Sequence, residues 1–141
     1  MDNDNIAQIF TRISNLLEIK GENKFKINAY IRAADCIRNT PQNLEGMSID
    51  ELKEIPGVGQ AIARKIIELN QTGHLVFLDQ LEKEIPPTLL EWLEIPGIGP
   101  KTTAVIWKTL GITTLPELQN AAKQGKLHTI PHIGERLEKK I

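Results

Sequence analysis

The sequence predicts an all-α protein made of two small helical subdomains. Apolar residues recur at helical spacing along most of the 141 residues, and no segment alternates between apolar and polar residues as a half-buried strand would. In addition, a five-residue pattern between two helical segments occurs three times. Such a repeat indicates a helix-turn-helix unit used more than once.

The first two helices are predicted before residue 40. Residues 2–5 offer side chains that can cap the first helix, and the sequence Gly21-Glu22-Asn23 breaks it. A second helix is predicted from about Phe25 to Arg38, ended by Thr40-Pro41. The residues expected on its buried face are Ile27, Tyr30, Ile31, Ala34 and Ile37.

Shorter helices flank the first copy of the repeated pattern. Residues 48–51 predict a capping box that starts the helix before it. Residues 61–69 predict the helix after it, with a stop at Thr72-Gly73. A further helix is expected over residues 74–84, before Pro86-Pro87.

The second part of the chain repeats this arrangement. Residues 88–94 lead into the second copy, and Pro100 starts a helix that ends at Leu110, because the missing N–H of proline costs nothing in the first turn. Thr114 is predicted to cap a helix that ends near Gly125. A last helix is expected over residues 135–141. We place the subdomains at residues 1–80 and 81–141.

The three copies of the pattern are repeat 1 (residues 55–59), repeat 2 (residues 95–99) and repeat 3 (residues 130–134). Repeats 1 and 2 read isoleucine, proline, glycine, an apolar residue and glycine. Proline suits the second position of a type II turn, and glycine suits the third, which needs a positive φ. Val58 and Ile98 are expected to anchor these turns in the core. In repeat 3, His132 replaces the first glycine.

Gly59 and Gly99 open the next helices without a side chain. Backbone N–H groups are therefore exposed at a helix N-terminus, with the positive end of the helix dipole behind them. Such a surface binds anions, and phosphate is the natural ligand. Because His132 must either adopt a positive φ at some cost or change the turn type, we expect repeat 3 to be structural.

The composition argues against several classes of protein. A net charge of −1 argues against a histone-like basic coat, so any affinity for nucleic acid must come from local groups. No segment approaches the length of a membrane span, and the polar, acidic amino terminus is not a signal peptide. The single Cys36 fits a reducing cytoplasm. We expect a cytoplasmic monomer without a membrane partner.

The turn sequence resembles the helix-hairpin-helix DNA-binding motif, with three ordinary helix-joining turns as the alternative. Beyond the turns, residues 17–23 and 25–30 are similar to the first two helices of family X DNA polymerases, the DNA polymerase β type. Residues 94–102 are similar to the second hairpin of that family. The resemblance extends over essentially the whole chain, and bacterial members look closest.

The resemblance implies sequence-independent binding of gapped or nicked double-stranded DNA in repair, such as base excision repair. Residues 1–80 would bind a 5′-phosphate at a DNA end, and residues 81–141 would grip the duplex. The palm, which binds Mg²⁺ and performs nucleotidyl transfer, is not in this sequence, so we expect no polymerase activity from it. The residues expected to contact DNA are Gly57, Gly59, Gln60 and Ala61 of the first hairpin and Gly97, Gly99, Lys101 and Thr102 of the second.

In some family members the first domain also acts as a 5′-deoxyribose-phosphate lyase through a lysine Schiff base. Alignment on repeat 1 places that nucleophile at Lys65. The chemistry needs a neutral amine, and we expect Arg64 and the nearby helix N-terminus to lower the pKa of this lysine. Lys26, Tyr30, Lys53 and Arg64 carry over as the 5′-phosphate pocket.

At two positions the sequence departs from the pattern of lyase-active family members, so lyase activity stays an open prediction. Ala61 stands where lyase-active members have a phosphate-binding lysine, and Phe25 stands where the best-known pattern has a histidine. The alternative for Lys65 is an exposed helix lysine, and Lys140 occupies the equivalent place in repeat 3. Whether this chain is an enzyme therefore stays open.

The resemblance also implies K⁺ or Na⁺ at the hairpins, although binding itself requires no cofactor. The carbonyls expected to hold the cation are those of Lys53, Ile55 and Val58 and those of Leu93, Ile95 and Ile98. Trp92, Trp107, Phe10 and Phe77 are expected in the core.

No stop signal precedes Ile141, so we expect the front part of a longer protein, with a natural end as the alternative. The alternative function is a stand-alone helix-hairpin-helix module that binds DNA or protein without a polymerase.

Overall fold

Helices make up all the regular secondary structure of the computed structural model, which describes residues 1–141. The all-α prediction is therefore confirmed. None of the helices is both long and apolar enough to span a bilayer. The elements are α1 (Asn3–Lys20), α2 (Lys24–Arg38), α3 (Ile49–Lys53), α4 (Gln60–Thr72), α5 (Val76–Glu84), the 3₁₀ helix η1 (Pro87–Glu94), α6 (Pro100–Leu110), α7 (Leu115–Lys123) and α8 (Glu135–Lys140).

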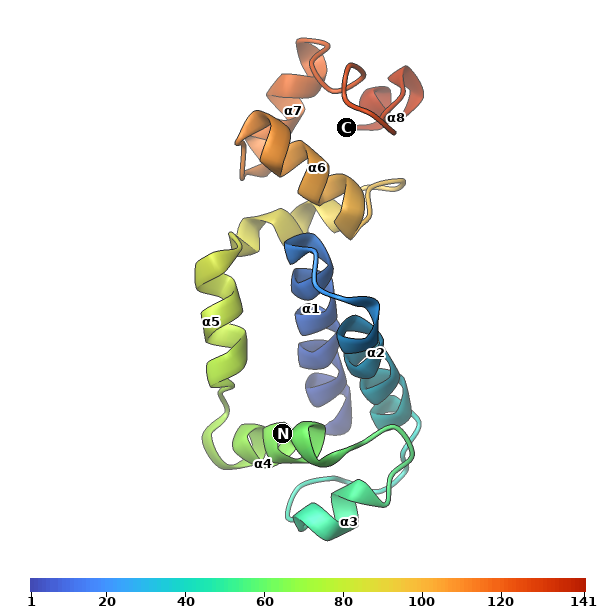
Figure 1. Ribbon diagram of the computed structural model, residues 1–141, viewed down its shortest axis with the longest axis vertical. Helices are drawn as coiled ribbons and strands as arrows, with labels where there is room; N and C mark the ends of the chain where they lie inside the picture. The colour runs from blue at the N-terminus through green and yellow to red at the C-terminus, as the bar shows by residue number, and fades with distance from the viewer.

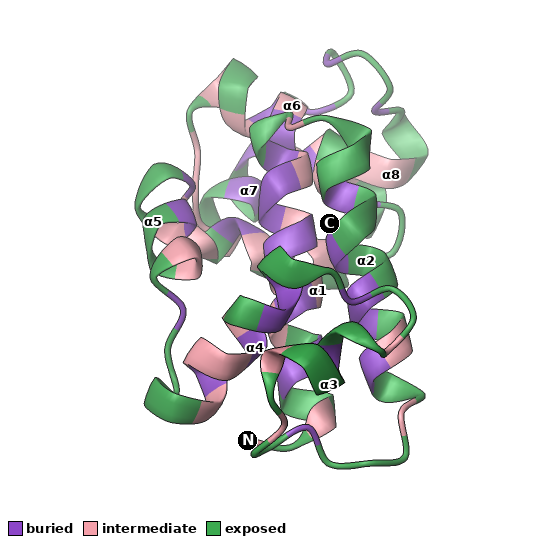
Figure 2. Cartoon of the chain, turned by 60° about the horizontal axis from the view of Figure 1, so that its bottom comes forward, coloured by how far each residue is buried: buried purple, intermediate pink, exposed green.

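Helix α1 lies along the middle of an elongated molecule and contacts α2, α5 and α6 (Figure 1). Helices α3 and α4 form one end, and α6, α7 and α8 form the other. Buried residues follow α1 and the inner sides of its neighbours (Figure 2), and they form one hydrophobic cluster. The two ends of the molecule are therefore joined through a shared core around α1.

Local capping explains where α1 and α2 begin and end. The Asp2 side chain accepts a hydrogen bond from the Asn5 N–H over 2.8 Å, and Gly21 ends α1 with a φ of 88°. The Asn23 side chain then accepts from the Lys26 N–H over 2.9 Å and starts α2. Since each of these signals is local, the sequence predicts both helices to within a residue or two.

The predicted buried face of α2 is wrong at one residue. Ile31 is 42% exposed, whereas Ala33 is fully buried. The buried stripe follows Ile27, Tyr30 and Ile37, and Ile31 lies just outside it. Its side chain instead lines a surface hollow that Lys101 also lines.

Helix α5 begins later than its apolar pattern suggests. The predicted start was residue 74, but α5 starts at Val76. The Thr72 hydroxyl accepts from the His74 N–H over 3.1 Å, which keeps His74 in the turn. The Glu68 carboxylate accepts from the Val76 N–H over 2.8 Å and so caps α5 from the preceding helix.

Helix α5 also continues across residue 80, where the boundary between subdomains is predicted. Two ion pairs connect this helix to α1. Arg12 Nε lies 2.7 Å from Glu82 Oε1, and Lys20 Nζ lies 2.8 Å from Glu84 Oε2. The division into residues 1–80 and 81–141 stays a prediction.

Candidate nucleic-acid interface

Repeats 1 and 2 fold as the predicted type II turns. The N–H of Val58 donates to the carbonyl of Ile55, and the N–H of Ile98 donates to the carbonyl of Ile95, each over 3.0 Å. The glycine at the third position of each turn has a positive φ, 88° at the first and 93° at the second. Val58 and Ile98 are buried, so each turn is anchored in the core.

The second glycine of each turn leaves the next helix open. Gly59 and Gly99 are the N-caps of α4 and α6, with φ of −90° and −105°, and neither helix has a side-chain cap. A methyl group built on either glycine would meet no other atom within 4 Å. The first-turn N–H groups of α4 donate to no backbone acceptor, and neither do those of Lys101 and Thr102 in α6, whose first residue, Pro100, has no N–H.

The predicted contact residues next to these glycines lie at the same helix starts. Gln60 and Ala61 open α4, and Lys101 and Thr102 follow Pro100 in α6. All but Thr102 are exposed, and Thr102 is half-buried. The structure thus places two sets of free donors at two helix N-termini, with one lysine at the second.

The first glycine of each turn also permits close packing, which the sequence pattern does not reveal. A methyl group on Gly57 would lie 2.8 Å from Cys36 Sγ and 3.1 Å from Arg32 Cγ, both on α2. A methyl group on Gly97 would lie 2.8 Å from Leu137 Cδ1 on α8. Each turn is therefore supported from behind by a helix distant in sequence.

Repeat 3 has the same turn, but a histidine stands at its third position and acidic residues follow it. His132 adopts a φ of 71°, which is the first of the two outcomes expected for it, and the Ile133 N–H donates to the Ile130 carbonyl over 3.1 Å. Helix α8 then carries Glu135 and Glu138 in its first turn. Carboxylates at this position are attracted to the helix N-terminus and disfavour a second anion there.

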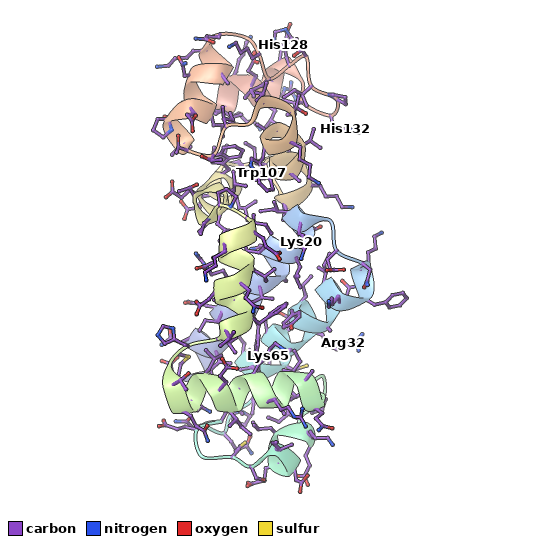
Figure 3. All side chains as sticks on the ribbon, turned by 60° about the vertical axis from the view of Figure 1, so that its left-hand side comes forward. Lys20, Arg32, Lys65, Trp107, His128 and His132 are labelled. Carbon is purple, nitrogen blue, oxygen red and sulfur yellow. The ribbon has the colours of Figure 1, made fainter.

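The predicted nucleophile Lys65 lies on α4 beside two aromatic rings. Its Nζ is 5.1 Å from the ring centroid of Phe77 and 6.0 Å from that of Tyr30. The two rings stack on each other with centroids 5.9 Å apart and an interplanar angle of 12°. In Figure 3, Lys65 and Arg32 lie near the α4 end of the molecule, far from His132.

Burial lowers the pKa of Lys65 below the usual lysine value, because the ammonium form loses hydration beside the rings. Glu68 opposes this shift by attraction, and Lys26 adds to it by repulsion. Burial also raises the pKa of Tyr30, which keeps its phenol neutral.

The predicted effect of Arg64 on the Lys65 pKa is wrong, because burial and Lys26 lower this pKa and Arg64 is not among the causes. The predicted effect of the helix N-terminus stays a prediction. Arg64 is exposed, and consecutive helix residues do not face each other. The lysine that does contribute, Lys26, comes from α2.

Of the predicted 5′-phosphate pocket, Lys26 and Tyr30 of α2 lie near Lys65. Lys53 lies at the end of α3 and is exposed, as Lys26 is. Phe77 was expected in the core, but it is half-buried and forms a wall beside Lys65. Only the packing of α5 beside α4 reveals that role, because its helical spacing alone indicates a core residue.

The hairpin carbonyls suit a monovalent cation. The carbonyls of Ile55 and Ile95 accept the turn hydrogen bonds and retain a second lone pair. The other four predicted carbonyls accept no backbone hydrogen bond, and they belong to Lys53, Val58, Leu93 and Ile98. Neutral carbonyl oxygens are the ligands that K⁺ and Na⁺ meet in protein sites, so this donor set fits the implied ion.

Comparison with known proteins gives matches along the chain. Residues 1–75 match the family model described as "Helix-hairpin-helix domain", and residues 89–141 match "SAM-like Helix-hairpin-helix tandem". The chain is 30% identical over its full length to DNA polymerase/3′-5′ exonuclease PolX of Bacillus subtilis and covers 24% of that protein.

Two eukaryotic relatives are similar over most of the chain. It is 34% identical over 84% of its length to DNA polymerase lambda of Arabidopsis thaliana, covering 22% of that protein. It is 28% identical over 85% of its length to DNA polymerase lambda of Rattus norvegicus, covering 20%. The chain thus spans only a quarter or less of these relatives. It belongs to the helix-hairpin-helix domain family and is homologous to the amino-terminal region of family X DNA polymerases.

Proposed function

We propose that this chain binds gapped or nicked double-stranded DNA through its sugar-phosphate backbone, as the amino-terminal part of a family X repair polymerase. One observation carries the proposal: two type II turns each lead into a helix whose available first-turn N–H groups donate to no backbone acceptor, and each N-cap glycine has open space around it. The helix-hairpin-helix family and the DNA polymerases among the relatives support DNA as the ligand. The alternative is a stand-alone module without a polymerase. Because the chain is homologous to DNA polymerases along its whole length, the amino-terminal part of a polymerase is favoured over this alternative.

The free donors explain how a chain with a net charge of −1 can bind a polyanion. Each N-terminus offers N–H groups and a partial positive charge to a phosphate oxygen, and Lys101 adds a full charge at repeat 2. Such contacts carry no base specificity. We expect affinity to fall with salt at a slope set by the few phosphates neutralised, because their counterions are released. We also propose that K⁺ or Na⁺ bound by the hairpin carbonyls adds positive charge beside the phosphates.

A preference for gaps would come from Phe25. This side chain is 90% exposed on α2 and stands between Lys24 and Lys26. An exposed phenyl ring provides a surface on which an unpaired base stacks. Intact duplex has no unpaired base, so this contact favours a gap.

The Lys65 pocket supports a lyase as a second activity of this chain. A lysine with a lowered pKa has more neutral amine at physiological pH than an ordinary surface lysine. In the proposed reaction, the amine attacks the C1′ aldehyde of the open sugar, and water leaves as the Schiff base forms. Loss of a C2′ proton to water then breaks the C3′–O bond, which leaves a 5′-phosphate on the DNA. Water finally hydrolyses the Schiff base, which releases the unsaturated sugar phosphate and restores the amine.

Substitution of the N-cap glycines tests the backbone contacts. Gly59→Asp and Gly99→Asp should each lower affinity for gapped DNA by about tenfold or more, which corresponds to about 1.4 kcal/mol. The new carboxylate fits without strain, caps the free N–H groups and repels phosphate. Fluorescence anisotropy measures the change. Gly134→Asp is the matched control, since Gly134 has a similar φ of −93° and open space. Unchanged affinity in the first two variants would refute the proposal.

Phe25→Ala tests the preference for gaps. We expect the variant to lose roughly 1 kcal/mol or more of binding free energy on gapped DNA, with little change on intact duplex. The fold should be unaffected because the ring is exposed. Competition binding with both DNAs gives the ratio of the affinity for gapped DNA to the affinity for intact duplex. Val76→Ala, which removes another exposed apolar side chain, serves as the control. An equal loss of affinity for both DNAs would argue against stacking of an unpaired base on Phe25.

Borohydride trapping on incised abasic DNA tests the lyase. The unsubstituted chain should form a covalent adduct, visible as a shifted band on a denaturing gel, and Lys65→Ala should form none. Lys140→Ala should behave like the unsubstituted chain, because Lys140 is exposed in repeat 3. If the unsubstituted chain gives no adduct, the lyase proposal is wrong, while DNA binding is unaffected.

The role of Lys26 can be measured directly. Lys26→Gln should raise the pKa of Lys65, because it removes a positive charge that disfavours the ammonium form. A side-chain NMR titration of Lys65 reports this pKa. Lys24→Gln makes the same charge change at an exposed residue that does not contribute to the shift, and it should leave the pKa unchanged. Equal shifts in both variants would contradict a specific interaction.

A further inference from the structure

Helix α8, which follows repeat 3, contacts the turn of repeat 2 through Leu137. Leu137 of α8 packs against the turn at Gly97, where a methyl group would lie 2.8 Å from Leu137 Cδ1. Gly97 is the residue with a φ of 93° that directs the chain toward the open N-terminus of α6. The position of Leu137 therefore affects where the free donors of repeat 2 lie.

Helix α8 cannot hold Leu137 in place by its own stability. It has only six residues, and such a short helix is unstable without tertiary contacts. The neighbouring residue Glu138 provides these contacts. Its Oε2 accepts from the N–H groups of Leu127 and His128 over 2.8 and 2.9 Å, and its Oε1 lies 3.0 Å from His128 Nδ1.

These bonds connect α8 to the buried core. Leu127 is fully buried, and the Glu138 side chain is only 11% exposed. The bond to His128 also lowers the pKa of Glu138, as do the two backbone N–H groups, which keeps the carboxylate ionised. We call this set of bonds between Glu138 and residues 127–128 the α8 clamp.

The other two turns show why repeat 2 needs this support. Repeat 1 rests on Arg32 and Cys36 of α2, a helix of 15 residues. In repeat 3, His132 carries a side chain at the glycine position and is exposed. Repeat 3 thus resembles the other two in backbone but differs at this position and is followed by a helix with an acidic first turn.

We propose that repeat 3 and α8 act as a support that positions repeat 2, with Leu137 as the positioning residue and the α8 clamp holding it in place. The inference rests on the proposed DNA binding and assigns repeat 3 an indirect part in it. Leu137 itself touches no DNA.

A double-mutant cycle on DNA affinity tests whether Leu137 acts through repeat 2. Leu137→Ala should weaken binding to gapped DNA by about threefold or more. The same substitution should have full effect in a Gly59→Asp background and no further effect in a Gly99→Asp background. Equal effects in both backgrounds would overturn the proposal, because a general loss of stability would act on both hairpins.

A second pair of variants tests the clamp without making a cavity. Glu138→Gln and Glu135→Gln remove the same charge from α8, and Glu135 is exposed and makes no side-chain hydrogen bond or ion pair. Only Glu138→Gln weakens the clamp, because a neutral amide oxygen is a weaker acceptor than a carboxylate oxygen, so it should bind gapped DNA less tightly than Glu135→Gln. Equal affinities would overturn the role of the clamp.

An NMR measurement without DNA separates this inference from the proposed function. In Leu137→Ala and Glu138→Gln the amide signals of Gly97 and Ile98 should shift, while those of Gly57 and Val58 should not. Unmoved Gly97 and Ile98 signals would refute the support even if DNA binding is real. If the signals shift as expected but Gly99→Asp does not change DNA affinity, the proposed function fails and the support stands as a structural fact.

Discussion

The positive φ at the third position of each turn is the constraint on which the rest of the structure depends. It reverses the chain within a few residues and lets the next helix start without a capping side chain. A side chain at the first glycine would disturb both the turn and the helix behind it. In repeats 1 and 2 glycine thus serves conformation and close packing together, whereas in repeat 3 His132 adopts the positive φ.

The core supplies the rigidity that this arrangement needs. The 18 residues of α1 contact α2, α5 and α6, and its buried face includes Phe10, Ile13 and Leu16. Each such side chain stabilises the fold by roughly 1.5–3 kcal/mol relative to an exposed one. The turns are anchored in this core by Val58, Ile98 and Ile133, so they cannot move independently of it.

Much of the fold could be predicted because its signals are local. Glycines end α1 and α4, two capping boxes start α3 and α7, and the turns follow from proline and glycine alone.

The wrong predictions concern residues whose burial or neighbours depend on how the helices pack together. Ile31 has the right spacing but lies at the edge of its stripe. The neighbours of Lys65 come from α2 and α5, so sequence proximity wrongly pointed to Arg64. The contact of Leu137 with Gly97 joins residues distant in the chain and leaves no sequence pattern.

The position of α1 between the two hairpins has a geometric consequence. In Figure 1 the loops before α4 and α6 lie on one side of the molecule, towards opposite ends of α1. An 18-residue helix is about 27 Å long, which is close to the rise of eight base pairs of duplex DNA. If both loops bind one DNA, as proposed, α1 would hold them at a fixed separation. A DNA that does not match this separation would then have to bend or release one hairpin.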